Sequence, residues 1–577
     1  MNLRKALAVT ALAVSPLATL AQSPDDGQPD KVTVHGNVQA DILVSTDSKE
    51  DREKNNAEVF SLNTYAQAGV YSKYVDGGVR FEYLEHPLPT FANVKGFKGW
   101  GVPNIYVKGK FKGNELTLGD FYDQFGSGFI LRTYEERSLG IDNSIRGVRY
   151  KTSAIKGVNL TALGGVQRRY WDWDMKSLLA GADLEIGFEN YSKTLREKGV
   201  NWNVGASWVY KHEKDEDIMV PGTSLDHING DQTPNPDHYY RLNLPKNVNS
   251  FDLRTDFHKD AWSILAEYAW KAPDPSLDNN YTYRHGDALM LSGSYSKKGL
   301  TALVQAKRSE NMSFRSRRSA SDLVAFINNM PPFAYQHTYA LASLYPYATQ
   351  NAPGEWAFQG AFGYNFKRKT ALGGKYGTKV RLNLSYIRGI KREGTWVNGD
   401  QHLYGTDGLK TKFFGLGDLY YQDFNLQVEK KLTSDFQMNL MYMYQRVNRF
   451  ITEGEVNPDG SHMVNAHIAV ADMKLKLNKK MTLRWEVQYL GTKQDKGDWL
   501  FGLAELSVLP YFMFSVSDQW NMDHGEHYYM AAITANYRSN RFMLGYGRTR
   551  EGYNCSGGVC RYVPETKGLT ISYNYNF

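Results

Sequence analysis

The stretch that decides the fold reads Leu569-Thr570-Ile571-Ser572-Tyr573-Asn574-Tyr575-Asn576-Phe577. Apolar or aromatic side chains stand at every second position, and Thr, Ser and Asn stand between them. Successive side chains of a β-strand point to opposite sides, so this pattern gives one apolar face and one polar face. We therefore expect a strand with one face toward an apolar medium or core and the other toward water.

The same alternation runs along nearly the whole chain after residue 21. In Leu483-Arg484-Trp485-Glu486-Val487-Gln488-Tyr489, the apolar and aromatic side chains share one face, and Arg484, Glu486 and Gln488 share the other. Helical periodicity is nearly absent. A water-soluble β-sandwich has the same local pattern, so alternation by itself leaves two folds open.

We expect about 24 strands, with a range of 22 to 26, from this pattern. They lie near 33–44, 58–73, 76–86, 103–112, 114–121, 143–153, 157–170, 179–192, 201–214, 249–258, 260–271, 285–296, 299–309, 355–367, 378–390, 419–431, 435–448, 462–477, 481–493, 498–507, 510–519, 527–537, 540–550 and 567–577.

The lengths of the connections separate the two folds. Tight turns such as Val75-Asp76-Gly77, Lys112-Gly113-Asn114 and Lys297-Lys298-Gly299 alternate with longer connections, of which 215–248 and 310–354 are the longest. Short periplasmic turns and long extracellular loops are typical of a bacterial outer-membrane barrel. The expected strands also reach the roughly 9–11 residues that a tilted membrane strand needs. The sequence therefore predicts an all-β, transmembrane antiparallel β-barrel, whose closure leaves no unpaired edge in lipid.

The composition narrows the choice of protein class. The 577 residues include 14% aromatic and 22% charged residues, and the mean hydropathy is −0.52. Two cysteines are too few for a multi-disulfide fold, a multi-cysteine zinc protein or an iron–sulfur protein. No apolar run after the first twenty residues is long enough for a spanning helix. The net charge is +7, and basic residues form no large block, so we expect no nucleic-acid partner.

Residues 1–21 have the features of a secretory signal peptide. Arg4 and Lys5 precede a short apolar stretch, and Thr19 and Ala21 are small residues at the −3 and −1 positions. An ordinary N-terminal helix is the alternative. We expect cleavage before Gln22, a short periplasmic segment over 22–32, and a single barrel over 33–577. The expected location is the bacterial outer membrane, with outer-membrane lipid around the barrel.

The final strand also predicts how the barrel is inserted. Its aromatic residues at every second position up to Phe577 resemble the C-terminal signal that the barrel-assembly machinery of bacteria recognises. Tyr573, Tyr575 and Phe577 are the candidate signal residues, and an ordinary terminal strand is the alternative. We therefore expect this machinery as a partner during insertion.

The lumen of such a barrel is too wide for side chains to fill. Because the first strand begins near residue 33, no N-terminal plug domain like that of a TonB-dependent transporter is expected. Segment 118–150 is rich in charges of both signs, which are plausible inside a barrel and costly toward lipid. We expect it to fold inward, as a structural network or as a selectivity element. The candidate pore-lining or constriction residues are Asp120, Asp123, Arg132, Glu135, Glu136, Arg137, Asp142, Arg146 and Arg149.

The connection 310–354 is too apolar for a solvated loop. Ser319 to Asp322 resemble a capping box before an apolar run that ends at Pro331, which predicts a short helix. The loop folds into the mouth of the barrel, packs on itself at the surface, or binds an envelope protein. The candidate plug or partner residues are Arg315, Arg317, Arg318, Phe326, Phe333, Tyr335, Tyr339 and Tyr345.

We find no catalytic constellation and expect neither enzyme activity nor a cofactor. Asp523, His524, Glu526 and His527 could bind a metal ion, but their spacing matches no helical zinc motif and a solvated loop is favoured. Cys555 and Cys560 lie in the last external loop. Because the expected compartment is oxidising, we predict a disulfide between them.

Three stretches carry a resemblance to a known family: His35 to Asp41, Gly119 to Gly128 and Asp142 to Gly147. With them, the whole mature chain resembles a family of uncharacterised, porin-like outer-membrane β-barrels from Bacteroidota. The resemblance implies the same fold and location. It implies no activity.

Two functions remain open. A wide polar lumen without a plug domain favours passive passage of small polar solutes, with inward-folded loops narrowing the lumen. The alternative is a non-catalytic barrel subunit of an outer-membrane assembly, secretion or surface complex, which would use loop 310–354 to contact its partner.

Overall fold

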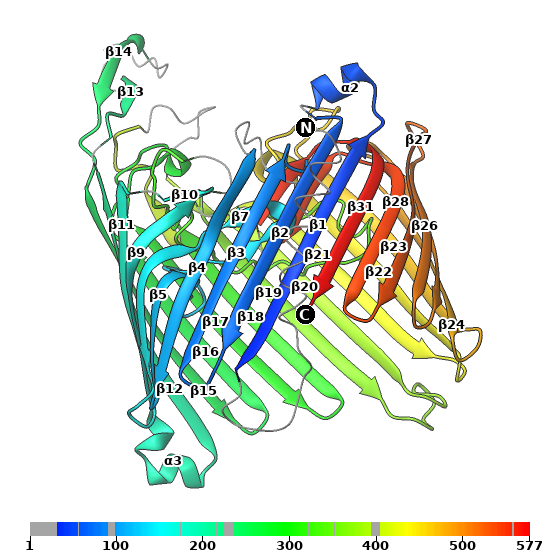
Figure 1. Ribbon diagram of the computed structural model, residues 1–577, viewed down its shortest axis with the longest axis horizontal. Coiled ribbons are helices and arrows are strands. Elements are labelled where there is room, and N and C mark those ends of the chain that lie inside the picture. The colour runs from blue at the N-terminus through cyan, green and yellow to red at the C-terminus, as the bar shows by residue number, and fades with distance from the viewer. Residues whose placement is uncertain are drawn as a thin grey trace.

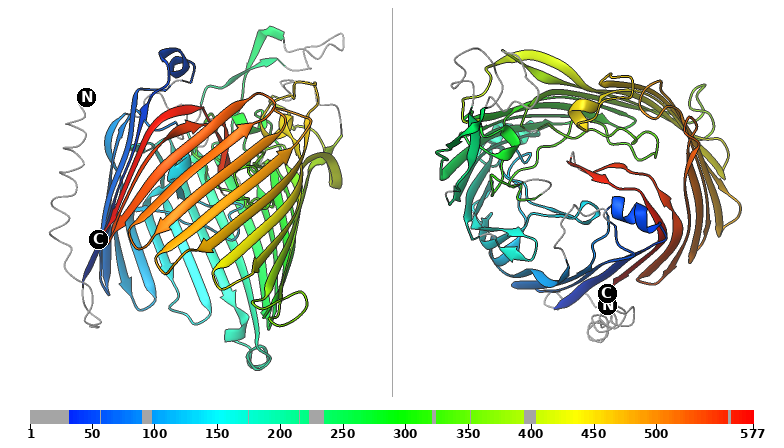
Figure 2. Two further views of the ribbon diagram at one scale, coloured as in Figure 1. Left: turned by 90° about the vertical axis from the view of Figure 1, so that its right-hand side faces the viewer. Right: turned by 90° about the horizontal axis from the view of Figure 1, so that it is seen from above.

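The computed structural model describes residues 32–55, 57–89, 98–173, 175–214, 216–222, 235–320, 324–350, 352–393, 404–556 and 559–577. Within them, twenty-four antiparallel strands form one closed barrel (Figure 1, Figure 2). The predicted fold class and strand number are therefore confirmed. The predicted signal peptide and residues 22–31 lie outside the described residues.

The barrel strands follow one another around the wall in chain order. They are β1 (Thr33–Ser45), β2 (Phe60–Tyr71), β3 (Val75–Glu85), β4 (Gly99–Phe111), β5 (Asn114–Phe121), β8 (Ile145–Thr152), β9 (Val158–Arg169), β11 (Ser177–Gly187), β12 (Val200–Glu213), β15 (Asn247–Lys259), β16 (Trp262–Lys271), β17 (Gly286–Lys297), β18 (Leu300–Glu310), β19 (Glu355–Phe366), β20 (Thr378–Arg392), β21 (Thr411–Lys431), β22 (Phe436–Asn448), β23 (Met463–Lys476), β24 (Met481–Gly491), β25 (Trp499–Val508), β26 (Phe512–Asn521), β27 (Glu526–Tyr537), β28 (Asn540–Thr549) and β31 (Thr566–Asn576).

The barrel closes where β1 pairs with β31. At the end of this seam, the backbone N–H groups of Gly36 and Phe577 each donate to the other residue's carbonyl oxygen at 3.0 Å. The Phe577 ring lies over Gly36, and a Cβ atom on residue 36 would come within 2.1 Å of a ring carbon. Glycine at position 36 therefore lets the last aromatic side chain cover the seam.

The connections are segregated by length. β1 begins and β31 ends at the lower edge of the barrel in Figure 1. Connections at this edge include the tight turns 112–113, 260–261 and 538–539, and the longest connections lie at the upper edge. Two lower connections, 188–199 and 367–377, are longer, and the first contains η2 (Phe188–Asn190) and α3 (Lys193–Glu197). Figure 2 shows both edges from the side.

The strand β21 is longer than predicted. It begins at Thr411 instead of near 419, and its register with β20 is irregular over the added residues. Phe413 and Phe414 pack against Trp356 of β19, with ring centroids 6.2 and 6.3 Å apart. These contacts hold the extension against the wall, and short-range alternation gives no sign of them.

Two other predicted boundaries are also wrong. The first lower turn comprises residues 72–74, so Val75-Asp76-Gly77 belongs to β3. There the Ser72 hydroxyl donates to the Val75 carbonyl at 2.6 Å and accepts from the Val75 N–H at 3.0 Å. The strand β11 ends at Gly187, before the predicted 192, because the chain turns into η2.

The outer face of the wall is apolar and the inner face is polar. Val304, Leu253 and Val516 are 71%, 60% and 56% exposed on the isolated barrel. Beside Val304, the Gln305 amide donates to the Ser292 hydroxyl at 2.9 Å on the inner side. The predicted period of two is therefore confirmed, with the apolar set on the outside.

A hydrophobic cluster fills part of the lumen. It combines wall residues with two upper-edge connections, 122–144 and 311–354, which fold inward. Phe129, Phe314 and Ile327 of these connections have no exposed surface, and Phe333 is 2% exposed. The barrel interior therefore has its own core, which packs the two inward segments against the wall.

Within the described part of the chain, none of the helices has the length and apolar character needed to cross a bilayer.

Candidate functional site

The first half of the inward connection 311–354 is bound to the wall by ion pairs. Arg318 pairs with Glu213 of β12 at 3.1 Å, and both side chains are at most 2% exposed. The backbone N–H of Arg318 also donates to Glu213 at 3.0 Å. Arg315 pairs with Asp278, in the neighbouring upper connection, at 2.6 Å. Of these two predicted plug residues, Arg318 is bound to the inner wall and Arg315 to a neighbouring connection.

A second buried pair supports this anchor. Lys211 of β12 pairs with Asp274 at 2.8 Å, and Asp274 lies 3.9 Å from Arg318. Burial tends to raise the pKa of the Asp274 carboxyl, but the attraction of Lys211 and Lys271 outweighs it and holds this pKa below its usual range. Asp274 therefore stays ionised and links the wall to the inward connection.

The helix predicted after Ser319 is wrong where the structure describes the chain. Residues 321–323 lie outside the described residues, and residues 324–330 form no helix. Instead, Phe326 pairs with Arg315 in a β-bridge, and the Arg315 guanidinium lies 3.9 Å from the centre of the Phe326 ring. Tertiary contacts of Arg315 therefore override a local helix signal. Arg317 pairs with Glu216 at 3.6 Å.

The second half of the connection runs along β20 to β24. The Tyr335 N–H donates to Ser385 at 3.0 Å, the Leu341 N–H donates to Gln488 at 2.8 Å, and Tyr339 accepts a hydrogen bond from Asn439 at 2.6 Å. The Tyr345 hydroxyl donates to Asp495 at 2.9 Å. Burial and this carboxylate raise the pKa of Tyr345. Of the three placements predicted for loop 310–354, the structure shows the inward one.

The second inward connection, 122–144, crosses the lumen beside the first. The Ser127 N–H donates to Glu267 of β16 at 2.9 Å. The Asn328 amide donates to the Phe129 carbonyl at 2.7 Å, and the Arg132 N–H donates to the Ile327 carbonyl at 2.9 Å. The two inward connections therefore form one body inside the barrel.

The nine charged residues predicted for the constriction are engaged with partners in a network. Arg146 pairs with Asp120 at 2.8 Å, and Arg149 pairs with Asp123 at 3.4 Å. Asp142 pairs with Arg80 and Arg168. The remaining contacts are those of Glu135 with Arg80 at 2.8 Å, Glu136 with the Ser138 hydroxyl at 2.6 Å, and Arg132 with the Tyr134 ring at 5.5 Å.

Arg137 joins this network to the first two strands of the wall. Its guanidinium donates to Gln39 of β1 at 3.2 Å and to Gln67 of β2 at 3.1 Å, and it lies 4.5 Å from the centre of the Tyr65 ring. Glu135 pairs with the same guanidinium at 2.7 Å. Arg137 therefore spans from the inward connection to the first two strands.

Three carboxylates of the network approach one another. Oxygen atoms of Glu82, Glu135 and Asp142 lie within 4.8 Å of one another, which is close enough to share a cation. Arg80 contacts all three, and Arg168 contacts Glu82 at 2.8 Å. The two guanidinium groups already supply the compensating charge at this position.

The sequence cluster considered for metal binding is dispersed. Asp523 accepts from the Asp498 N–H at 3.1 Å, Glu526 accepts from Tyr528 at 2.8 Å, and His527 pairs with Asp518 at 2.7 Å. These side chains therefore turn to different partners.

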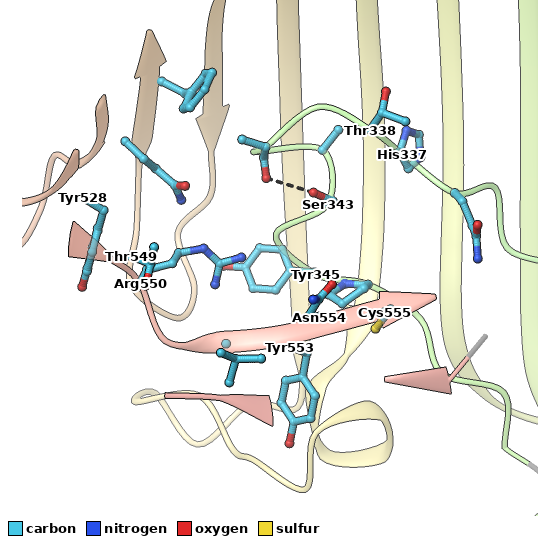
Figure 3. A pocket seen from close by; sticks show the side chains of 18 of the residues that line it. His337, Thr338, Ser343, Tyr345, Tyr528, Thr549, Arg550, Tyr553, Asn554 and Cys555 are labelled. Atoms are coloured by element: carbon cyan, nitrogen blue, oxygen red, sulfur yellow. Dashed lines mark hydrogen bonds between the residues drawn. The ribbon is translucent and has the colours of Figure 1, made fainter. Parts of the chain in front are cut away.

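A cavity of about 760 Å³ remains between the inward connection and the wall formed by β25 to β31 and β1. We call it the mouth cavity. Figure 3 shows Tyr345 and Ser343 of the inward connection facing Tyr528, Thr549 and Arg550 across it. The other lining residues used below are Ser517, Gln519 and Arg548 of the wall and Tyr335 and His337 of the connection.

A second cavity, of about 450 Å³, opens nearer the lower edge. Asn37 of β1 lines this base cavity, and Leu43 of the same strand lines the mouth cavity. Gln39, which holds Arg137, lies between these two positions along β1. Arg137 therefore stands at a level along β1 between the two cavities.

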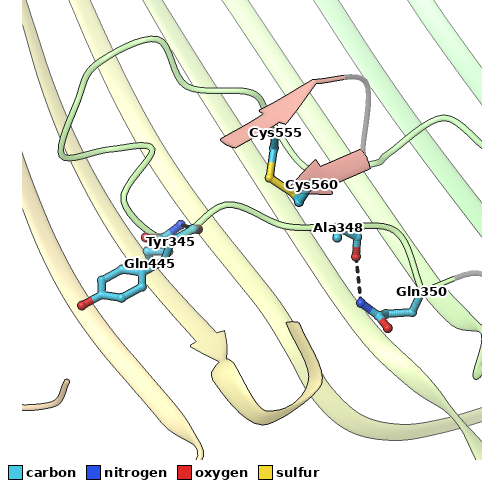
Figure 4. Close-up of a disulfide and its surroundings, with 6 residues drawn as sticks. All are labelled: Tyr345, Ala348, Gln350, Gln445, Cys555 and Cys560. Atoms are coloured by element: carbon cyan, nitrogen blue, oxygen red, sulfur yellow. Dashed lines mark hydrogen bonds between the residues drawn. A yellow bond between two sulfur atoms is a disulfide. The ribbon is translucent and has the colours of Figure 1, made fainter. Parts of the chain in front are cut away.

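The predicted disulfide is confirmed. Cys555 and Cys560 are bonded in a hairpin formed by β29 (Gly552–Ser556) and β30 (Val559–Val563). Figure 4 shows this hairpin beside the inward connection near Tyr345 and Ala348. Cys555 and Tyr553 line the mouth cavity, and the Tyr553 hydroxyl donates to the Glu453 carbonyl at 3.0 Å. The hairpin therefore forms one side of that cavity.

Sequence reasoning missed the wall side of the mouth cavity. Gln519, Tyr528 and Arg548 lie on three separate strands, β26, β27 and β28, and none belongs to a motif. Alternation places Gln519 and Tyr528 inside, but it groups Arg548 with the outward Leu544 and Tyr546 of β28. Alternation also does not show which wall positions the inward connections leave uncovered.

Comparisons with known proteins show the family. The sequence profile of one family matches residues 3–577. The chain belongs to this family of unknown function, DUF6029. No curated protein matches the chain.

Several solved structures are similar in fold. The siderophore receptor PirA from Pseudomonas aeruginosa is 8% identical with a TM-score of 0.42, over 96% of this chain and 81% of that one. The translocation pore of the P pilus usher PapC is 8% identical with a TM-score of 0.43, over 95% and 99%. OccAB3 from Acinetobacter baumannii is 9% identical with a TM-score of 0.35, over 95% and 99%.

Proposed function

We propose that the protein is an outer-membrane barrel that lets small polar solutes pass passively through the part of its lumen that the inward connections leave open. The mouth cavity carries this proposal. Its volume of about 760 Å³ lies in the range of pockets that hold small molecules, and Ser517, Gln519 and Thr549 give it polar groups.

The outer surface supports the membrane location. A barrel with apolar side chains such as Val304 and Leu253 on its outside would expose a large apolar area to water. In a bilayer the same area is covered by lipid, and the closed barrel pairs its backbone groups around the wall. Removal of a signal peptide at residue 21, insertion by the barrel-assembly machinery and an origin in Bacteroidota belong to this proposal.

Osmotic swelling of liposomes tests the passage of solutes. Liposomes that contain the purified barrel should swell in isotonic solutions of small polar solutes such as glycerol and glucose, and should exclude a large dextran. Swelling no faster than that of protein-free liposomes, with a folded barrel in the bilayer, would contradict the proposal.

The alternative, a non-catalytic subunit of an envelope complex, receives less support. Phe333 and Tyr345 of loop 310–354 are 2% and 3% exposed and pack inside the barrel. A partner outside the cell would not reach them unless the loop left the lumen. A cross-linked partner lost on deletion of residues 323–347 would favour this alternative.

A further inference from the structure

The mouth cavity is unevenly charged. Among its lining residues in the described part of the chain, Arg548 and Arg550 carry full positive charge, and no Asp or Glu is present. A cavity inside a low-dielectric wall strengthens the field of such charges. Carboxylates lie behind the lining, and one of them, Glu565, pairs with Arg548. Arg550 is therefore the lining cation that can attract a negatively charged solute most directly.

Arg550 has most of its hydrogen-bonding capacity free. Its guanidinium donates to the Glu551 carbonyl at 2.8 Å, and the structure shows no carboxylate within ion-pair distance of it among the described residues. Glu453 and Asp495 lie within electrostatic range, but each is paired with Arg449 at 2.8 Å. A guanidinium has five N–H donors, so several remain for a ligand.

Arg550 is also partly withdrawn from solvent. Burial lowers the pKa of the Arg550 guanidinium below its ordinary value, because few polar groups replace its hydration. In Figure 3 the guanidinium extends between Thr549 and the Tyr345 ring, along the cavity. An anion that enters the cavity can therefore pair with a cation that the protein leaves without a close counter-charge.

Arg548 stands on the same strand end. It pairs with Glu565 at 2.6 Å through Nε, and its guanidinium lies 4.8 Å from the centre of the Tyr528 ring. Gln519, which is 9% exposed, has its side-chain nitrogen buried without a hydrogen-bond partner. Arg548 and Gln519 therefore add further polar donors to the lining of the same cavity.

The rest of the lining suits the carbon skeleton of a small solute. Tyr335, Tyr345 and Tyr553 offer aromatic faces, and Ser343, Ser517 and Thr549 offer hydroxyl groups. Aromatic faces bind apolar ring faces, and hydroxyl groups bind other hydroxyl groups through hydrogen bonds.

We propose that the mouth cavity is a binding site for a small organic anion, whose phosphate or carboxylate group is held by Arg548 and Arg550 while its polar skeleton lies against the tyrosines. This deepens the proposed function, on which it rests, by naming the class of solute. Guanidinium groups are the usual side-chain partners of these anionic groups in proteins.

Equilibrium binding to the full-length barrel in detergent tests this site without any need for passage. The probes are glucose 6-phosphate, inorganic phosphate, glucose and glucosamine, measured by calorimetric titration. We expect glucose 6-phosphate to bind at least tenfold more tightly than glucose, and glucosamine not to bind. Inorganic phosphate should bind more weakly than glucose 6-phosphate, because it makes no contact with the tyrosines.

Matched variants assign the binding to the two arginines. Arg550→Gln and Arg548→Gln should each weaken binding of glucose 6-phosphate at least tenfold, whereas Arg550→Lys should keep part of it. Arg538→Gln removes the same charge from a lower turn and should leave binding unchanged. A difference in electrophoretic mobility between unheated and heated samples shows that each variant is folded.

The outcomes separate the site from the channel. Equal binding of glucose and glucose 6-phosphate, or unchanged binding in both arginine variants, would overturn the anion site even if liposomes swell. Binding of glucose 6-phosphate that depends on both arginines, without swelling, would retain the site and contradict passage.

Discussion

Arg318 and Glu213 form a buried ion pair of 3.1 Å between the inward connection and the barrel wall. The two residues are far apart in the sequence, because 105 positions separate them. The pair fixes where connection 311–354 enters the lumen, and the position of the mouth cavity follows from that path. The pair thus adds a long-range electrostatic contact to the hydrophobic core that packs the inward segments against the wall.

Arg318→Ala should loosen the inward connection. Glu213 keeps Lys211 as a partner at 3.0 Å, so the variant loses the charge-assisted contacts of the Arg318 guanidinium, which costs about 1.5–3 kcal/mol. Trypsin should then cleave after Arg315 or Arg317 in the folded barrel, as read by mass spectrometry. Lys193→Ala, an exposed charge removed at the lower edge, should leave cleavage unchanged. An uncut connection in Arg318→Ala would show that the pair does not hold it.

Acid should break the Lys211–Asp274 ion pair, which supports the inward connection, only at low pH. The pKa of Asp274 is depressed in the folded protein, so its pairing is complete above the unfolded value of about 3.9 and is lost as pH falls through the folded value. The swelling rate of liposomes should therefore be constant from about pH 8 to about pH 5 and change only below about pH 4. A transition centred near neutral pH would exclude Asp274 as the group responsible.

Arg137→Ala should widen the lumen at the level between the two cavities. The variant loses the contacts to Gln39 and Gln67 that hold segment 135–142 against β1 and β2. We expect glucose-driven swelling to become at least twofold faster, and Arg137→Lys to lie between the two. An unchanged rate would mean that this contact does not limit passage.

Charge on the outer face should impair membrane insertion. Val304→Arg places a cation on an outward position that is 71% exposed on the isolated barrel, and this costs about 2–4 kcal/mol near the bilayer centre. Gln305→Arg, one residue away on the inner face, should be tolerated. Urea unfolding in lipid vesicles measures both. Equal destabilisation would contradict the assignment of outer and inner faces.

Reduction of the Cys555–Cys560 disulfide should act locally. The bond closes a short loop with a sequence separation of 5, for which loop-closure entropy predicts about 2 kcal/mol. Dithiothreitol, or a Cys555→Ser and Cys560→Ser double variant, should raise hydrogen exchange in residues 552–563 and leave the barrel strands protected. Loss of protection in β27 or β28 would show a wider role.

The strands could be predicted from sequence because their signal is local. Alternation places Arg484 inside and Val487 outside without any knowledge of neighbouring strands, and the structure agrees: Arg484 pairs with Asp472 in the lumen, whereas Val487 is 48% exposed. The lengths of the connections then indicated a barrel and showed which edge has the short turns, because outer-membrane barrels have short turns at one edge and long loops at the other.

The interior could not be predicted in the same way. The Leu341 N–H is bound by Gln488, 147 residues away, and nothing near either residue indicates the contact. The capping-box pattern at Ser319 predicted a helix because it is a local rule, and the buried pairs of Arg315 and Arg318 override it. Arg548 and Arg550 line the mouth cavity only because the inward connections leave that part of the lumen open, and no local pattern indicates this.

Single-channel recording in planar bilayers tests the central claim most directly. The purified full-length barrel should give stable ohmic steps, and deletion of residues 332–347 should give larger ones, because that segment occupies part of the lumen. Silent bilayers with the folded protein inserted, and no conductance after the deletion, would contradict the account of a membrane barrel with an open route.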